Sequence, residues 1–195
     1  MSELEAEAWH EDLALPGSVL DGATLAGASF VDCSFSGGSA AGADLSRTIW
    51  RGGGLSGLRL VTAKLMRAQL TRVTLEDCAL SGVDLSVSTW RNVTLRGCLL
   101  EVVNLRQSAL DTVVFEDCTL REVTFGSARL SGLRFPGCRV ERLDLTDARL
   151  SAVDLRGASV EIAAGFDRLR GAVINTGQLM SLAPALAAHL GITVD

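Results

Sequence analysis

Residues 73–97 read VTLED CALSG VDLSV STWRN VTLRG, and the third letter of each group is a large apolar residue. The same period of five runs without a break from about Ser18 to Val160. Every fifth residue from Leu20 to Val160 is apolar, mostly Leu with some Phe and Trp, and a second uncharged residue stands two positions before each. None of these 58 positions holds Asp, Glu, Lys or Arg. All the charge therefore lies on the other three residues of each unit.

A strict period of five excludes an α-helix, because it would move the apolar residues around the helix surface. In a strand, side chains alternate between the two faces, so the two uncharged positions of a unit point inward and their neighbours point outward. The fifth residue must turn the chain. Glycine is frequent there, as at Gly22, Gly82 and Gly97, as expected where the backbone bends tightly. The period predicts an all-β chain that winds as a coil of short straight sides.

The number of sides in each coil follows from the spacing of like residues. Phe30, Trp50 and Trp90 are separated by multiples of 20 residues, and an inward cysteine recurs every 20 residues at Cys78, Cys98, Cys118 and Cys138. If like residues stack when coils lie above one another, each coil has four sides. Residues 18–160 then form about seven coils, a rod on the order of 35 Å long at the usual spacing between paired strands.

Three units carry a resemblance to a known family. The sequences ADLSR at 43–47, VDLSV at 83–87 and VDLRG at 153–157 resemble the A(D/N)LXX unit of the pentapeptide-repeat family. The resemblance implies a right-handed quadrilateral parallel β-helix with a filled core. Members of this family include DNA-mimicking proteins that bind type II topoisomerases such as gyrase and protect them from fluoroquinolones. The gyrase-binding members dimerise through their C-terminal ends, while most members have no assigned role.

Residues 1–17 are expected to form a short acidic N-terminal cap. Ser2 and Glu5 have the spacing of a capping box, which predicts a short helix through about Trp9. Trp9 and Leu13 would then cover the open end of the first coil, as terminal repeats of solenoids must. An arm that binds a partner is the alternative.

Residues 161–195 are expected to form a C-terminal helical cap or dimerisation segment. Asn175 and Gln178 fit a capping box, Gly191 fits a C-terminal stop, and Pro184 is expected to kink the helix. The helix carries an amphipathic stripe at spacings of three, four and four residues, made of Leu179, Leu182, Leu186 and Leu190. This stripe can seal the last coil or form a two-fold dimer contact, which the resemblance favours, and the two roles are compatible.

Charge is distributed unevenly along the chain. The formal net charge is −5, residues 1–17 alone contribute −5, and the repeat body 18–160 carries +1. DNA mimicry needs a dense negative surface in place of phosphate charge. Arg96, Arg134 and Arg156 share a side with the candidate acidic partner-binding row, which departs from that requirement. The row consists of Glu76, Asp77, Glu116, Asp117 and Asp154.

A basic run interrupts the acidic residues between Asp44 and Glu76. It consists of Arg47, Arg51, Arg59, Lys64, Arg67 and Arg72. The run is interpreted first as a solvated surface. A site for an acidic partner is the alternative, and a nucleic-acid site is disfavoured because no aromatic residues are interleaved for base stacking.

No residue pattern predicts catalysis or metal binding. His10 and His189 lie in the non-repetitive ends, and neither is near a nucleophile motif. The four-cysteine ladder is interpreted as structural, because tetrahedral metal binding needs ligands that converge from several directions and buried thiols behave as small hydrophobic groups. The outward residues Asp44, Asp84, Asn104 and Asp144 are expected to support the coil.

These features together predict a non-enzymatic cytoplasmic protein without cofactor, metal or small-molecule substrate. No membrane segment is expected, because no apolar run approaches the roughly 20 residues of a transmembrane helix. The expected partners are a second copy of the chain and another macromolecule. A type II topoisomerase is the specific partner that the resemblance implies, and direct nucleic-acid binding is not expected.

Overall fold

Each five-residue unit forms one side of a coil in the computed structural model, which describes residues 4–193. The fifth residue of the unit turns the corner in the left-handed region at every position from 22 to 157, with φ between +49° and +84°. Seventeen of these twenty-eight corners are not glycine, so the conformation is imposed by the coil as a whole. The expected corner position is therefore confirmed.

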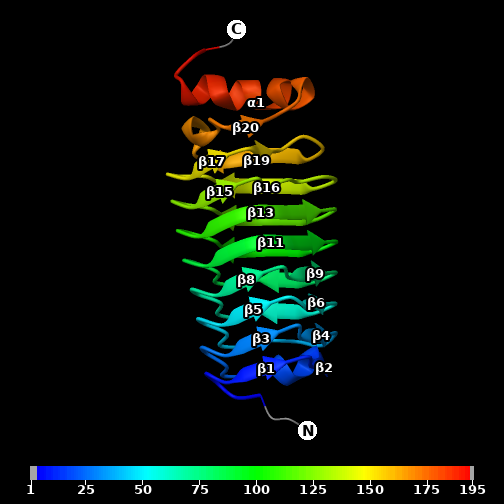
Figure 1. Ribbon diagram of the computed structural model, residues 1–195. Coiled ribbons are helices and arrows are strands. Elements are labelled where there is room, and N and C mark those ends of the chain that lie inside the picture. Colours follow the sequence, from blue (N-terminus) through cyan, green and yellow to red (C-terminus); the bar gives the residue numbers. More distant parts are fainter. Residues whose placement is uncertain (1–3, 194–195) are drawn as a thin grey trace.

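The coils stack into a rod with parallel strands in register (Figure 1). Each strand pairs with the strand four units away in sequence, as in Trp50↔Leu70 and Leu70↔Trp90, which confirms four sides per coil. The β1 side carries eight stacked strands in the described part of the chain: β1 (Trp9–Glu11), β3 (Ser29–Val31), β5 (Ile49–Arg51), β8 (Gln69–Thr71), β11 (Thr89–Arg96), β13 (Ala109–Glu116), β15 (Arg129–Ser131) and β17 (Arg149–Ser151).

The next side of each coil is the β2 side, which β11 and β13 also reach because they continue around the corner. Its strands are β2 (Ala14–Pro16), β4 (Ser34–Ser36), β6 (Gly54–Ser56) and β9 (Thr74–Glu76), followed toward the C-terminus by β18 (Val153–Asp154) and β20 (Ala172–Val173). The β7 side follows, with β7 (Arg59–Val61), β10 (Ala79–Ser81), β12 (Leu99–Asn104), β14 (Thr119–Thr124), β16 (Arg139–Asp144) and β19 (Ser159–Ala164).

The fourth side, here the bridge side, is held mainly by single β-bridges that link Thr24, Asp44, Lys64, Asp84 and Asn104 in sequence. Its aspartates cap the corners. The carboxylate of Asp44 accepts the amide of Ser46 at 3.0 Å, and the same contact with the residue two positions on recurs at Asp84, Asn104, Asp144 and, on the β2 side, Asp154. These side chains thus support the coil, as expected.

The inward residues form one continuous core of apolar columns. Phe30 stacks on Trp50 with ring centroids 4.3 Å apart, and Phe115 stacks on Phe135 at 5.0 Å. Burial of each such large side chain contributes about 1.5–3 kcal/mol. Two buried hydroxyls satisfy the indole N–H groups that the core would otherwise isolate: Trp50 donates to Thr48 at 2.9 Å, and Trp90 donates to Ser88 at 3.0 Å.

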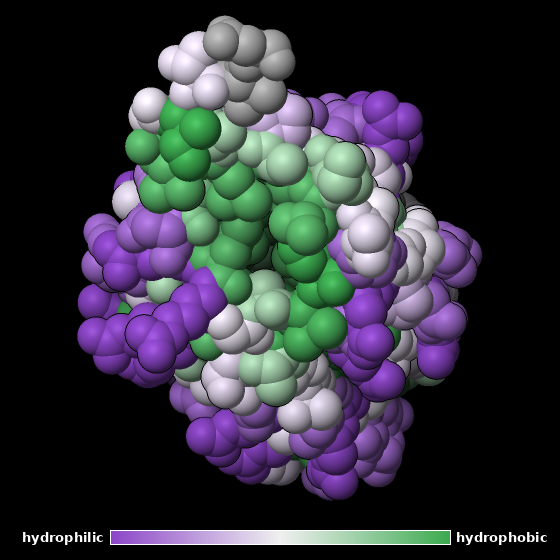
Figure 2. Space-filling model, turned by 90° about the horizontal axis from the view of Figure 1, so that it is seen from above, coloured by the Kyte–Doolittle hydropathy of each residue, from purple (hydrophilic) through white to green (hydrophobic). Residues whose placement is uncertain are grey.

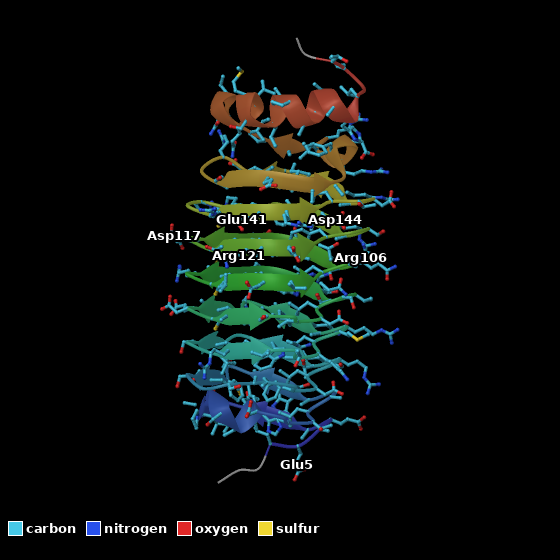
Figure 3. The ribbon with its side chains drawn as sticks, turned by 180° about the vertical axis from the view of Figure 1, so that it is seen from behind. Glu5, Arg106, Asp117, Arg121, Glu141 and Asp144 are labelled. Carbon is cyan, nitrogen blue, oxygen red and sulfur yellow. The ribbon has the colours of Figure 1, made fainter. Side chains whose placement is uncertain are left out.

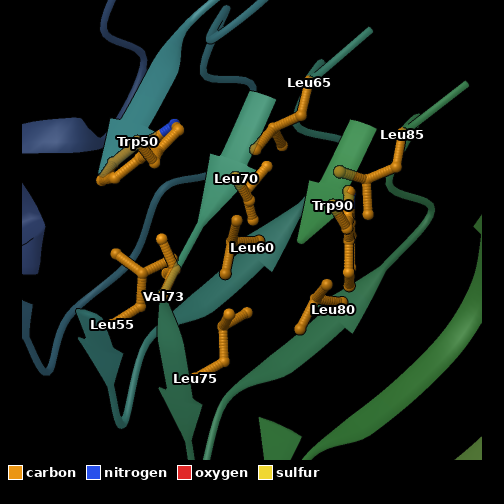
Figure 4. Close-up of a pocket in the computed structure, with 10 residues that line it drawn as sticks. All are labelled: Trp50, Leu55, Leu60, Leu65, Leu70, Val73, Leu75, Leu80, Leu85 and Trp90. Atoms are coloured by element: carbon orange, nitrogen blue, oxygen red, sulfur yellow. The ribbon is translucent and has the colours of Figure 1, made fainter. Parts of the chain in front are cut away.

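A small apolar cavity of about 20 Å³ lies between the two tryptophans (Figure 4). Leu70 occupies the column position between Trp50 and Trp90, and it is smaller than either ring. The sequence predicts a filled interior, and the structure differs at this point. The cavity is about the size of a single water molecule and has an apolar lining, so it offers no room for a substrate.

The N-terminal helix expected from Ser2 through Trp9 is wrong for the residues that the structure describes, and Ser2 itself lies outside them. Glu7 already occupies a left-handed corner at φ +55°, and its amide donates to the carbonyl of Ala26. Residues 7–17 therefore belong to a coil, because pairing with the next coil satisfies their backbone groups. The rod consequently has about eight coils, not the seven predicted from residues 18–160.

At the other end, the coil gives way to a helix. The register between β16 and β19 shifts beyond Val160, where the five-residue period ends. A short 3₁₀ turn, Phe166–Arg168, leads through β20 to helix α1 (Thr176–His189), and a second such turn, Gly17–Leu20, lies in the first coil. The capping box of Asn175 and Gln178 is present, and Gly191 follows the helix at φ +72°. Helix α1 lies across the end of the rod (Figure 1).

Candidate interaction surfaces

The predicted acidic row lies on the β2 side, and arginines interrupt it. Arg96 is in register with Glu76 below it and Glu116 above it. Its guanidinium contacts both carboxylates, with Nη1 3.2 Å from Glu76 Oε1 and Nε 2.9 Å from Glu116 Oε2. This contact with both carboxylates raises the pKa of Arg96. The charge of two of the row's five acidic residues is therefore shared with one cation.

The other three residues of the row occupy two kinds of position. Asp77 and Asp117 are exposed corners at φ +50° and +52°. Asp154 stands in register with Arg134 and forms a two-point ion pair with Arg156, at 2.7 and 2.9 Å. The structure thus brings the five acidic residues to one side, where arginines lie between them along the rod. Register alone predicts these neighbours, since each lies one coil away from its partner or within the same unit.

A second charge ladder lies on the β7 side, where sequence reasoning did not place a site. Arg121 lies between Glu101 and Glu141, at 3.5 Å from each carboxylate, and Figure 3 shows Arg121 and Glu141 on neighbouring coils. Arg142 pairs with Glu122 at 3.2 Å. Opposite charges one coil apart in the sequence are the signal that identifies such ladders. Both ladders are largely exposed, and exposed pairs contribute little to stability.

The basic run is divided among three sides of the rod. Arg51 lies on the β1 side in β5, Arg47 and Arg67 occupy the corners that lead into this side, and Arg72 occupies the corner that ends it after β8. Arg59 lies on the β7 side, and Lys64 lies on the bridge side between Asp44 and Asp84. Four of the six cations therefore share one face, which Arg91 of β11 joins.

The predicted leucine stripe of α1 divides into an inner and an outer part. Leu182 is only 4% exposed, and Leu186 packs against the core, so these two seal the last coil. Leu179 and Leu190 are 48% and 70% exposed. Two further exposed apolar residues, Met180 and Ile192, are not in the predicted stripe because they fall outside its spacing. Figure 2 looks down on this end, where hydrophobic residues gather around the centre and hydrophilic residues ring them.

The glutamine of the capping box has a second role at this end. Gln178 Nε2 donates to the carbonyl oxygens of Leu155 at 2.5 Å and Ala158 at 2.8 Å. These carbonyls belong to the last coil, between β18, which pairs with β20, and β19. One side chain therefore caps the helix and fixes it to the end of the sheet.

The chemically reactive residue types are used structurally. His10 lies at an inward position of the first coil and stacks on Phe30 at 5.3 Å, which differs from its expected place outside the repeat. His189 packs near Phe166. The cysteines of the ladder are buried free thiols. Thiols buried among apolar side chains are inert, because burial disfavours the thiolate.

Within residues 4–193, no cluster of His, Cys, Asp or Glu side chains is arranged to hold a metal ion. The same residues contain no helix that is long and apolar enough to cross a bilayer. A hollow of about 330 Å³ that is open to solvent lies over Gly126 on the bridge side, beside Arg106. The ion pair of Arg106 with Asp144, at 3.5 Å, lies on the same side (Figure 3).

The solved structures that match most of the chain include the following two proteins. One is QnrB1, a plasmid-mediated fluoroquinolone resistance protein, with 18% identity over 96% of this chain and 99% of that chain and a TM-score of 0.44. The other is HetL, a pentapeptide repeat protein involved in heterocyst differentiation regulation from the cyanobacterium Nostoc sp. strain PCC 7120, with 20% identity over 90% and 91% and a TM-score of 0.33. The comparison with curated proteins finds no match.

Two family models match separate parts of the rod. The model for pentapeptide repeats in eight copies matches residues 15–52, and the model for a pentapeptide repeat region matches residues 68–145. Together they cover more than half of the chain, and both describe the five-residue unit whose inward and corner positions the structure displays. The chain therefore belongs to the pentapeptide-repeat family.

Proposed function

We propose that this chain is a non-catalytic rod that pairs with a second copy through its C-terminal end and presents its sides to another macromolecule. The observation that carries the proposal is the apolar surface over α1, formed by Leu179, Met180, Leu190 and Ile192. These side chains are not needed to seal the coil, since Leu182 and Leu186 already do so. Contiguous exposed apolar patches ringed by polar residues are typical of protein interfaces.

A two-fold contact through this end suits the geometry of a rod. A two-fold interface uses the same patch on both copies, and the patch here lies on the flat end instead of on a side. Pairing would bury the exposed apolar side chains and leave all four sides of each rod open. The interface residues that we propose are Leu179 and Leu190 from the predicted stripe, with Met180 and Ile192 added.

The oligomeric state tests this part of the proposal. Replacing Met180→Glu and Leu190→Glu together places two carboxylates in the contact, and we expect the dissociation constant of the dimer to rise at least about a hundredfold. The matched control is Val61→Glu with Met66→Glu, two exposed apolar residues on the sides of the rod. Light scattering coupled to size exclusion measures the mass. A wild-type protein that stays monomeric at 100 µM, or equal effects of the two pairs, would contradict the proposal.

We propose the absence of catalysis because apolar side chains fill the interior of the described coils around a cavity of about 20 Å³, and the hollow beside Arg106 is open to solvent. A rigid, filled rod is suited to presenting side chains at fixed spacings. Capture of binding proteins from the native host, followed by turnover assays on what is recovered, tests this. Turnover of any substrate that disappears on mutation of an outward residue would overturn the non-catalytic assignment. We further propose a cytoplasmic location, since the buried cysteines are free thiols, the state that a reducing compartment preserves.

Gyrase binding by DNA mimicry is the more specific function that family resemblance implies. Its physical requirement is a continuous negative side, and the pairing of Arg96 with Glu76 and Glu116 works against it. A supercoiling assay with purified gyrase separates the two functions. We expect neither inhibition nor protection from a fluoroquinolone at micromolar protein, and either effect would replace our general proposal with the specific one.

A further inference from the structure

The arginines of the β1 side form a basic surface that is separate from the apolar end over α1 and from the charge ladders of the β2 and β7 sides. Arg51 and Arg91 are outward residues in register with Thr71, so they lie two coils apart on the same column. The amide of Arg72 donates to the carbonyl of Arg91 at 3.0 Å, and that of Arg47 donates to Met66 at 2.8 Å. We call this surface the arginine face; its charged members are Arg47, Arg51, Arg67, Arg72 and Arg91, all exposed or partly exposed.

No acidic residue lies within the three stretches that build the arginine face, 47–52, 67–72 and 87–92. Their other outward residues are neutral, and Gln69, Thr71 and Asn92 add hydrogen-bonding groups between the guanidiniums. The face ends at Asp32, whose carboxylate lies against Gly52, and at Asp111, which is in register with Arg91. It therefore covers three coils, a length of about 10 Å along the rod.

The arginines of the rod are used differently in its two halves. Among the described residues, no carboxylate lies within ion-pair distance of any arginine from Arg47 to Arg91. From Arg96 onward, seven of the eleven arginines form such pairs: Arg96, Arg106, Arg121, Arg139, Arg142, Arg156 and Arg168. Arg129, Arg134, Arg149 and Arg170 form none with the described carboxylates. Five of the six unpaired arginines up to Arg91 therefore lie together on one face, within three consecutive coils.

Guanidinium groups bind carboxylates and phosphates with two parallel hydrogen bonds. The dimensions of the face decide between the possible anions. Duplex DNA binds tightly when a protein contacts about six to ten phosphates, and a duplex laid along this side would also meet Asp32, Asp111 and the acidic first coil. An extended peptide advances about 3.3 Å per residue, so three or four acidic residues match the length of the face.

Building on the proposed function, we propose that the arginine face docks a short carboxylate-rich segment of a partner protein. The carboxylates of the segment pair with Arg51, Arg72 and Arg91. Its backbone forms hydrogen bonds with the neutral side chains between these arginines. The acidic residues at both limits of the face, Asp32 and Asp111, repel a longer acidic chain and so restrict the length of the segment.

The test uses tetraglutamate peptide, whose length matches the face, as the probe and the full-length protein. Fluorescence anisotropy at low salt is expected to show saturable binding. The triple variant Arg51→Gln, Arg72→Gln and Arg91→Gln is expected to weaken it by at least about tenfold. The matched control, Arg106→Gln, Arg121→Gln and Arg142→Gln, removes the same charge from paired arginines and is expected to change binding less than about twofold. Unchanged circular dichroism verifies that both variants fold.

Three results would overturn the inference: no saturable binding of tetraglutamate by wild-type protein, equal weakening in the two triple variants, or tighter binding of another anion that the face triple abolishes. For the last, a 20-base-pair duplex and vesicles containing phosphatidylserine are measured in parallel. Failure here is distinguishable from failure of the proposed function. If the native-host capture recovers the same proteins with the face triple, the arginine face is not the docking site, while the presenting rod stands.

Discussion

Val102 holds its backbone in a conformation that valine ordinarily avoids. Its φ is +54°, at a corner of the β7 side, and its side chain is 54% exposed. A residue with a Cβ atom loses about 1–2 kcal/mol in the left-handed region, and β-branched residues are rarest there. The coil tolerates this cost because the inward residues on both sides of the corner are fully buried.

Replacing Val102→Asn is therefore expected to stabilise the protein by about 1 kcal/mol, because asparagine visits the left-handed region readily. The urea midpoint measures the change. The reverse experiment is Gly22→Val, at a corner with φ +64° where an added Cβ meets no atom; it isolates backbone strain and should cost a similar amount. Equal midpoints for wild type and both variants would show that the corners carry no strain.

Asp44 shows how an outward side chain supports a corner. Hydrogen bonds from the hydroxyl and the amide of Ser46 lower the pKa of Asp44 below its ordinary value of 3.8. A carboxyl group whose pKa is lower in the folded state stabilises that state above its unfolded pKa, and this contribution is lost as the pH falls through the folded value. Asn104 makes the same contact with the amide of Arg106 without a titrating group.

The variant Asp44→Asn should therefore be less sensitive to acid than the wild type. The difference between its urea midpoints at pH 7 and pH 2.5 is expected to be smaller, because the amide keeps the corner contact at both values. Asp111→Asn on the β1 side is the control, and it should leave the acid sensitivity of the wild type unchanged. An Asp44→Asn protein that loses as much stability in acid as the wild type would refute this role of the carboxylate.

At the scale of elements, the contact between α1 and the last coil depends on Gln178. Its amide joins the helix N-terminus to two carbonyls of the coil, and that of Leu155 also accepts the amide of Ala158 at 3.2 Å. Gln178→Ala removes both side-chain contacts, and we expect a loss of about 1–3 kcal/mol, because the carbonyl of Ala158 would lose its partner and an acceptor without a partner costs its desolvation. Hydrogen exchange should accelerate in 153–189 and stay unchanged in the central coils. Ser181→Ala, on the exposed side of α1, is the control.

Several elements can be predicted from sequence and several cannot, for definite reasons. The period predicts the inward residues, the corners and the four sides, since each is a property of one unit or of units one coil apart. The period does not predict the first coil, because His10 occupies an inward position that Leu, Phe or Trp holds in most other coils. Periodicity predicts the stripe of α1 but does not say which leucines meet the coil, so only the structure separates Leu182 from Leu179. The sequence predicts that the residues of the acidic row lie on one side of the rod. It does not predict that Arg96 contacts two of their carboxylates, because this depends on the side-chain conformation.

At the scale of the whole molecule, each coil contacts only its neighbours. Because the register repeats with every coil, removal of residues 101–120 should leave a folded rod that is shorter by roughly 4.8 Å. Removal of residues 101–118 instead breaks the period and should prevent folding of everything after the junction. Circular dichroism and small-angle scattering compare the two. Similar behaviour of both deletions would mean that the period is not what holds the coils together.

The apolar end over α1 also sets the valency of the protein. If two rods join there, the assembly is rigid, and the two arginine faces are fixed on either side of the junction, separated by β13, β15 and β17 of each copy. The distance between them is on the order of 50 Å. Two weak sites at a fixed separation bind a partner with two matching segments far more tightly than either site alone. A partner whose segments are spaced differently cannot occupy both sites, so its affinity is that of a single site. The contact at the end of the rod would then fix the distance between the two arginine faces, and partners would be selected by the spacing of their acidic segments.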